Sequence, residues 1–124
     1  MKNIKSLPQD LVDRYQTWRA GVFEQKSTHY SDLANHGQNP QFMIISCCDS
    51  RVHVTEIFGA DTGDIFAHRN VANLVPPYKP NSDHHGTSAA VEYGVRALKV
   101  RNLIVFGHSQ CGGVAACHNI CTHG

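Results

Sequence analysis

The chain of 124 residues is long enough for one domain with a modest core, so we expect a single domain that spans residues 1–124. Eleven Lys and Arg residues balance ten Asp and Glu residues to a formal net charge of +1, and neither sign forms a run, which argues against nucleic acid as a partner. The longest apolar stretches, residues 42–45 and 103–106, are far shorter than the ~20 residues of a membrane-spanning helix, so we expect no membrane partner.

Hydrophobic spacing predicts an amphipathic helix near the N-terminus, from about residue 8 to residue 25. Pro8 suits the first turn of a helix, and apolar side chains then recur on one helical face, namely Leu11, Tyr15, Trp18 and Val22. This stripe could pack on the chain's own core or on a partner subunit, and we expect the chain's own core. Residues 35–40 have the composition of a loop.

Three short segments predict the strands of a sheet. Residues 42–46 are apolar on both faces, as in a buried parallel strand, while residues 64–69 and 103–106 give a second and a third candidate. A loop over residues 76–86 precedes a helix that we expect from about residue 87 to residue 99. The order strand, strand, helix, strand predicts an α/β fold with a mostly parallel central β-sheet flanked by helices.

The N-terminal sequence and the number of cysteines both bear on the cellular compartment of the protein. The first residues contain no apolar signal core and no small-residue cleavage site, so we expect a cytoplasmic protein. Thiols stay reduced in that compartment, and the five cysteines therefore favour a metal site or thiol chemistry over disulfides.

Two of the predicted strands are followed by metal-binding residue types. Cys47 follows the first strand and His108 the last, and the carboxyl ends of parallel strands meet at one edge of a sheet. Cys111 lies three residues after His108, close enough to reach the same ion. Two thiolates and one imidazole suit zinc, and three ligands leave one tetrahedral position open for catalysis. A closed structural site is the alternative, with a fourth ligand from Cys117, His118, Cys121 or His123.

Asp49 and Arg51 follow Cys47 at offsets of two and four, so they must lie near the predicted metal. Asp49 could fill the fourth metal position, or a bidentate pair with Arg51 could hold it as an acceptor for a hydrogen bond from metal-bound water. An ordinary surface ion pair is the simpler alternative.

Three segments together resemble the successive signatures of the β-class carbonic anhydrases, in their plant-like branch. They are Cys47-Cys48-Asp49-Ser50-Arg51-Val52, His68-Arg69-Asn70-Val71-Ala72-Asn73-Leu74 and Gly107-His108-Ser109-Gln110-Cys111-Gly112-Gly113. The resemblance covers residues 38–114 closely and the N-terminal helix more loosely. Members of the family run well beyond this point, so the chain is similar to a family domain whose C-terminal part is missing.

The resemblance implies a lyase that performs the reversible hydration of CO2 to bicarbonate with a metal-bound hydroxide. It implies a zinc ion held by Cys47, His108 and Cys111, a catalytic pair of Asp49 and Arg51, and a closed resting form in which Asp49 also binds zinc. The family further implies a homodimer or a multiple of dimers.

The same resemblance places four side chains in the substrate pocket, although the three hydrophobic ones among them are more often simply part of a core. They are Gln38, Phe66, Val71 and Tyr93. Ile44 stands where another branch carries a Trp of an inhibitory bicarbonate site, so we expect no such inhibition here. We expect Cys48 to be an inert buried thiol, and His84 and His85 to be a solvated pair in a loop.

Other functions compete with this interpretation. Residues 107–111 nearly match the nucleophile elbow of serine hydrolases, but no Asp or Glu follows Ser109. A thiol enzyme could use Cys47 or Cys111 as its nucleophile. The chain could also be a zinc-binding but inactive fragment, or a relative that hydrolyses carbon disulfide or carbonyl sulfide.

Overall fold

The computed structural model describes residues 5–79, 81 and 83–124. Contacts divide the chain into two units, one up to Gly37 and one from Gln38 onward. All the residues that we predict to bind metal or substrate belong to the second unit. The single domain over residues 1–124 stays a prediction.

The first unit is helical. Helix α1 (Gln9–Trp18) continues into a π-helical stretch, η1 (Arg19–Phe23), and α2 (Ser27–His36) follows a turn. The residue after α2 is Gly37, which has a φ of 83°. Glycine adopts this conformation without strain because it has no Cβ. The helix expected over residues 8–25 is confirmed. The loop expected over residues 35–40 is partly wrong, because α2 extends to His36.

The apolar stripe of α1 and η1 is not buried. Helix α1 contains no buried residue, and Leu11 and Tyr15 are about half exposed. Packing of this stripe on the core of the second unit stays a prediction. Aromatic side chains of the first unit pack on one another: the Phe23 ring lies 5.2 Å from the rings of both Trp18 and Tyr30. Tyr30 comes from α2, a helix that the sequence pattern did not reveal.

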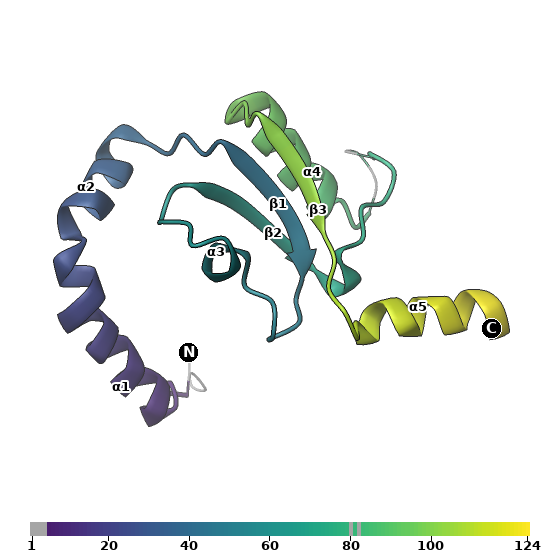
Figure 1. The fold of residues 1–124 in the computed structure, drawn as a ribbon, viewed down its shortest axis with the longest axis horizontal. Helices are drawn as coiled ribbons and strands as arrows, with labels where there is room; N and C mark the ends of the chain where they lie inside the picture. Colours follow the sequence, from purple (N-terminus) through teal and green to yellow (C-terminus); the bar gives the residue numbers. More distant parts are fainter. Residues whose placement is uncertain (1–4, 80, 82) are drawn as a thin grey trace. The chain divides into compact units, whose positions relative to one another are not determined.

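The second unit is built on a three-stranded parallel sheet with the strand order β2-β1-β3 (Figure 1). The strands are β1 (Phe42–Cys47), β2 (Ile65–Asn70) and β3 (Asn102–Phe106). The central strand pairs with both neighbours, so that Ile44 lies opposite Ala67 on one side and Ile104 on the other. The three predicted strands and the α/β fold with a parallel sheet are confirmed.

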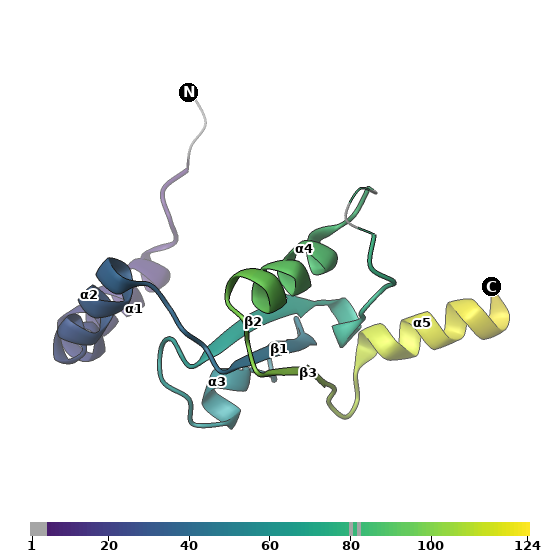
Figure 2. The ribbon, with the colours of Figure 1, turned by 90° about the horizontal axis from the view of Figure 1, so that it is seen from above.

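Helices cover both faces of this sheet (Figure 2). One face carries α4 (Gly86–Glu92) with its π-helical continuation η3 (Tyr93–Ala97), as expected, and the other carries α3 (Val54–Ile57). Helix α5 (Gly112–His123) follows β3 and points away from the sheet. The sequence did not predict α3, which is too short to show a period, or α5, which opens with two glycines and has no buried residue. No helix in the described part of the chain is both long enough and apolar enough to cross a membrane.

Strand β1 forms the centre of the core, and every residue from Met43 to Cys47 is buried. Alternate side chains of a strand point to opposite faces. Ile44 packs with Val52 and Val54 on the α3 face. Met43 packs against Gly94 on the α4 face, where the glycine allows a close approach of helix and strand.

Gly94→Ala tests this close approach. A Cβ at position 94 would lie 2.6 Å from Sδ of the fully buried Met43 and 3.3 Å from Cδ1 of Phe66. We expect the substitution to lower the free energy of unfolding by about 1–3 kcal/mol, the usual effect of overpacking a core. Denaturant unfolding measures this change.

Gly86→Ala is the matched control, because a Cβ at position 86 would meet nothing within 4 Å. If the two variants unfold at the same denaturant concentration, η3 does not pack on β1 as closely as described.

Candidate metal centre

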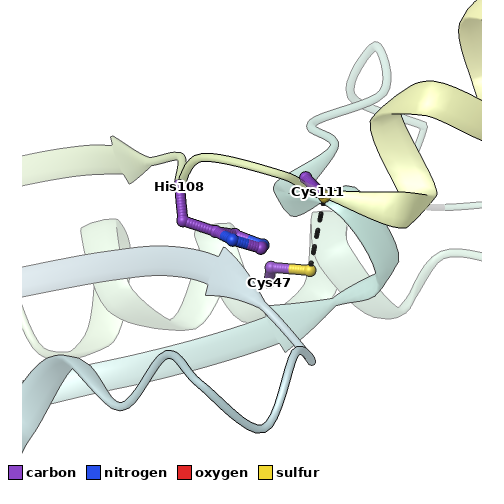
Figure 3. Close-up of side chains that lie close together, drawn as sticks. All are labelled: Cys47, His108 and Cys111. Carbon is purple, nitrogen blue, oxygen red and sulfur yellow. Dashed lines mark hydrogen bonds between the residues drawn. The ribbon is translucent and has the colours of Figure 1, made fainter.

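Cys47, His108 and Cys111 come together at the carboxyl ends of two neighbouring strands (Figure 3). Cys47 is the last residue of β1, His108 lies two residues beyond β3, and Cys111 caps the N-terminus of α5. One ligand atom from each residue lies within 4.8 Å of the other two. Because β1 and β3 are parallel neighbours, their ends share one edge of the sheet, as predicted from the order of the elements.

The donor atoms fit a tetrahedral zinc ion. Zn–S bonds of ~2.3 Å place two thiolates on one tetrahedral ion about 3.8 Å apart, and the Sγ atoms of Cys47 and Cys111 are 3.8 Å apart. The Nδ1–H group of His108 donates to Ser109 O over 2.9 Å, which leaves Nε2 as the atom with the free lone pair. This Nε2 atom is buried and has no hydrogen-bond partner. A metal ion would satisfy it.

Backbone groups prepare the Cys47 sulfur for a metal. The N–H groups of Asp49 and Ala72 point at Sγ over 3.4 and 3.3 Å. The hydrogen bond from Asp49 N–H is the main cause that lowers the pKa of the Cys47 thiol from 9.0 to about 7, followed by the nearby imidazole of His108. The thiolate, which is the form that binds metals, is therefore more populated near neutral pH than at an ordinary cysteine.

Asp49 and Arg51 form the bidentate pair described from the sequence. Arg51 Nε donates to Oδ1 over 2.9 Å, and Nη2 donates to Oδ2 over 2.7 Å. These hydrogen bonds hold the pKa of Asp49 well below its usual range. Asp49 Oδ2 lies 3.9 Å from His108 Nε2. Arg51 also donates to Gln110 O over 3.0 Å, which ties the pair to the turn before Cys111.

Comparison with known proteins shows that a family described as carbonic anhydrase matches residues 42–124. The chain belongs to the carbonic anhydrase family. Its similarity is to the β class, as predicted. Beta carbonic anhydrase 5, chloroplastic, of Arabidopsis thaliana is 41% identical over 107 residues, which cover 86% of this chain and 35% of the relative.

Two further relatives agree. Beta carbonic anhydrase 3 of Arabidopsis thaliana is 36% identical over 118 residues, covering 92% of this chain and 45% of that protein. The structure of a tetrameric β-carbonic anhydrase from the ascomycete Sordaria macrospora matches with a TM-score of 0.75 and 38% identity, covering 87% of this chain and 52% of that one. This carbonic anhydrase chain therefore spans about half the length of its relatives, or less.

Arg69 is a supporting residue that the sequence did not assign. Its Nε donates to Cys47 O over 2.9 Å and its Nη2 to Asp49 O over 2.8 Å, so it fastens the turn that follows β1. Arg69 lies within the second motif of the resemblance, which was the signal that could have found it. The Ala72 N–H group gave no such signal, because it is a backbone group whose direction depends on the fold.

The hollow beside the ligands differs from the pocket expected from the sequence. It has a volume of about 430 Å³ and is lined by His108, Gln110 and Cys111 together with four residues of α5: Val114, Ala115, His118 and Asn119. None of the four expected pocket residues lines it. The Phe66 and Tyr93 rings contact each other with centroids 5.6 Å apart, while Val71 and Gln38 are exposed. Their roles in substrate binding stay predictions.

Among the residues that the structure describes, three side chains form the ligand group, so one position of a tetrahedral metal ion has no protein ligand. Within residues 5–79, 81 and 83–124, the group of three ligands includes neither Asp49 nor any of the tail residues Cys117, His118, Cys121 and His123. Asp49 is instead paired with Arg51. A metal role for Asp49 stays a prediction.

The expectation of a buried thiol at Cys48 is wrong. Strand β1 ends at Cys47, so Cys48 lies in the exposed segment that follows, and its backbone N–H donates to Asn70 O over 2.8 Å. His84 and His85 are exposed, as expected.

Cys47→Ser tests the ligand group. Serine is a poor zinc ligand at neutral pH, so we expect a large loss of zinc affinity. The loss should exceed the ~10–100-fold that usually follows removal of an outer partner, a residue that hydrogen-bonds to a metal ligand without binding the metal itself. Metal analysis after gel filtration and competition with a chelator measure the effect. Cys48→Ser is the matched control, since its side chain is exposed and outside the group. Stoichiometric zinc in Cys47→Ser would refute the assignment.

Proposed function

We propose that this chain binds one Zn²⁺ through Cys47, His108 and Cys111 and catalyses the reversible hydration of CO2 to bicarbonate. The observation that carries the proposal is the cluster of two sulfur atoms and one unpartnered imidazole nitrogen at the end of the sheet. Membership of the carbonic anhydrase family supports the reaction. When bound at such a site, zinc lowers the pKa of water and so supplies a nucleophile near neutral pH, to about 7 in the carbonic anhydrases with three His ligands.

Asp49 and Arg51 orient the water molecule that reacts. An ionised carboxylate can only accept hydrogen bonds, and Arg51 keeps Asp49 ionised. Asp49 Oδ2 lies beside the His108 nitrogen, so it can accept one O–H of a water molecule at the ligand group and turn a lone pair of that water toward CO2. Arg51 fixes the carboxylate by its two parallel hydrogen bonds. Binding of Asp49 to zinc in a closed resting form is the alternative role.

CO2 is small, has no charge and accepts hydrogen bonds weakly, so its pocket needs apolar walls and few donors. We propose Phe66, Val71 and Tyr93 as walls and Gln38 as the donor, on the basis of the family resemblance. The contact between the Phe66 and Tyr93 rings supports a shared apolar surface.

The assembly and the compartment belong to the same proposal. A homodimer or a multiple of dimers is supported by the tetrameric relative from Sordaria macrospora. A cytoplasmic location is supported by the five free cysteines. We also propose that both units belong to one zinc domain.

A zinc-binding chain without turnover is the second candidate. It is favoured by the length of the chain, which covers only 35% and 45% of two plant relatives. The ligand group lies entirely within residues 47–111. Catalysis, in contrast, also needs a complete substrate pocket.

Zinc content measured beside stopped-flow CO2 hydration separates these candidates. We expect about one zinc per chain, with turnover that a chelator abolishes and added zinc restores. Zinc without turnover would select the second candidate. Carbon disulfide and carbonyl sulfide serve as competing substrates in the same assay, and faster turnover of either would overturn CO2 as the substrate.

Asp49→Ala tests the role of the pair. The substitution leaves the three ligands in place but removes the acceptor, so we expect bound zinc and a loss of turnover of ~10–100-fold, as for other outer partners of a metal site. Glu56→Ala, on the exposed surface of α3, is the control and keeps both properties. Full activity in Asp49→Ala would refute the catalytic pair.

A further inference from the structure

Gly113 brings the first turn of α5 into direct contact with the short 3-10 helix η2 (Val71–Asn73). A Cβ at position 113 would lie 2.7 Å from Val71 Cγ1, 2.9 Å from Ala72 Cβ and 3.2 Å from Ala72 N. These distances are too short for a side chain of any size. At the neighbouring Gly112, a Cβ would meet nothing within 4 Å. The contact is therefore specific to Gly113.

Helix η2 has an unfavourable backbone conformation that contacts with neighbouring residues must stabilise. Ala72 has φ 68° and Asn73 has φ 47°, both in the left-handed region, where the Cβ of a non-glycine residue crowds the backbone. Ala72 is almost completely buried. On one side the Asn70 side chain bonds both backbone groups of Leu74, over 2.6 and 2.8 Å, and closes the turn. On the other side lies Gly113.

The left-handed turn directs one N–H group at the metal site. Ala72 N–H points at Cys47 Sγ over 3.3 Å, and Ala72 is the residue whose N and Cβ lie against Gly113. The same helix α5 begins directly after Cys111, whose sulfur lies 3.8 Å from that of Cys47. A displacement of α5 from η2 would thus disturb both sulfur atoms at once.

We propose that Gly113 is a positioning residue for the metal site: by letting α5 rest on η2, it holds Ala72 N–H against Cys47 and sets the spacing of the two thiolates. This inference rests on the proposed zinc binding and adds to it a residue that touches neither metal nor substrate. It acts through Ala72 on one side and through Cys111 on the other.

Gly113→Ala compared with Gly112→Ala is the test. Both substitutions place a methyl group in the first turn of α5 and change helix propensity alike, but only the first one meets η2. We expect zinc affinity, measured by competition with a chromophoric chelator, to fall ~10–100-fold in Gly113→Ala, as for other outer partners of a metal site. It stays unchanged in Gly112→Ala.

Cobalt substitution provides a readout that general loss of stability does not move. The near-ultraviolet absorption of the Co²⁺-loaded protein reports charge transfer from the two thiolates, so we expect a shifted or weaker band in Gly113→Ala and the wild-type band in Gly112→Ala. If both glycine variants give the same affinity and the same cobalt spectrum as wild type, the proposal is overturned.

Compensating substitutions keep the proposal testable if Gly113→Ala alone folds poorly. Val71→Ala and Ala72→Gly together remove the two closest carbon atoms, and Ala72→Gly also suits the positive φ. We expect the triple variant to regain zinc affinity and the cobalt band, and failure to regain either would count against the inference. A wild-type chain without zinc would overturn the proposed function itself. Zinc bound equally well by wild type and Gly113→Ala would overturn only the role of Gly113.

Discussion

The parallel pairing of β1 with β3 is the constraint on which the metal site depends. It places the carboxyl ends of the two strands at one edge, so that Cys47 and Cys111, 64 positions apart in the sequence, bring their sulfur atoms to 3.8 Å. The buried residues of β1 hold this register, because a slip of one residue would turn every side chain of the strand to the opposite face. Core packing and metal chemistry therefore depend on the same strand.

The three motifs contribute different parts of one site. The first provides Cys47 and the Asp49–Arg51 pair, and the third provides His108 and Cys111. The second motif contains none of the three ligands that lie together, but Arg69 and the Ala72 N–H group support the turn and the sulfur of the first motif. In a site of this kind, the residues that bind the metal are themselves held in place by hydrogen bonds from neighbouring groups.

Strands and ligand types could be predicted because their signals are local. Apolar runs of strand length marked β1 and β3, and the residues that follow them marked the end of the sheet. The short helix α3 and the glycine-led α5 have no such signal. The packing partner of the α1 stripe could not be predicted either, because a helical pattern shows which side chains share a face but not what covers that face. The predicted burial of Cys48 was wrong for a related reason, since the exposure of its side chain depends on the exact residue at which β1 ends.

The donor residues, their order along the chain and the α/β fold could all be inferred from the sequence, because residue type, spacing and hydrophobic pattern carry that information. The distance between the two sulfur atoms, the free lone pair on His108 and the contact of Gly113 with Ala72 become visible in the folded chain alone. These features arise between segments that are distant in the sequence or from backbone groups that all residues share. Their geometry exists only once the strands have paired and α5 has met η2.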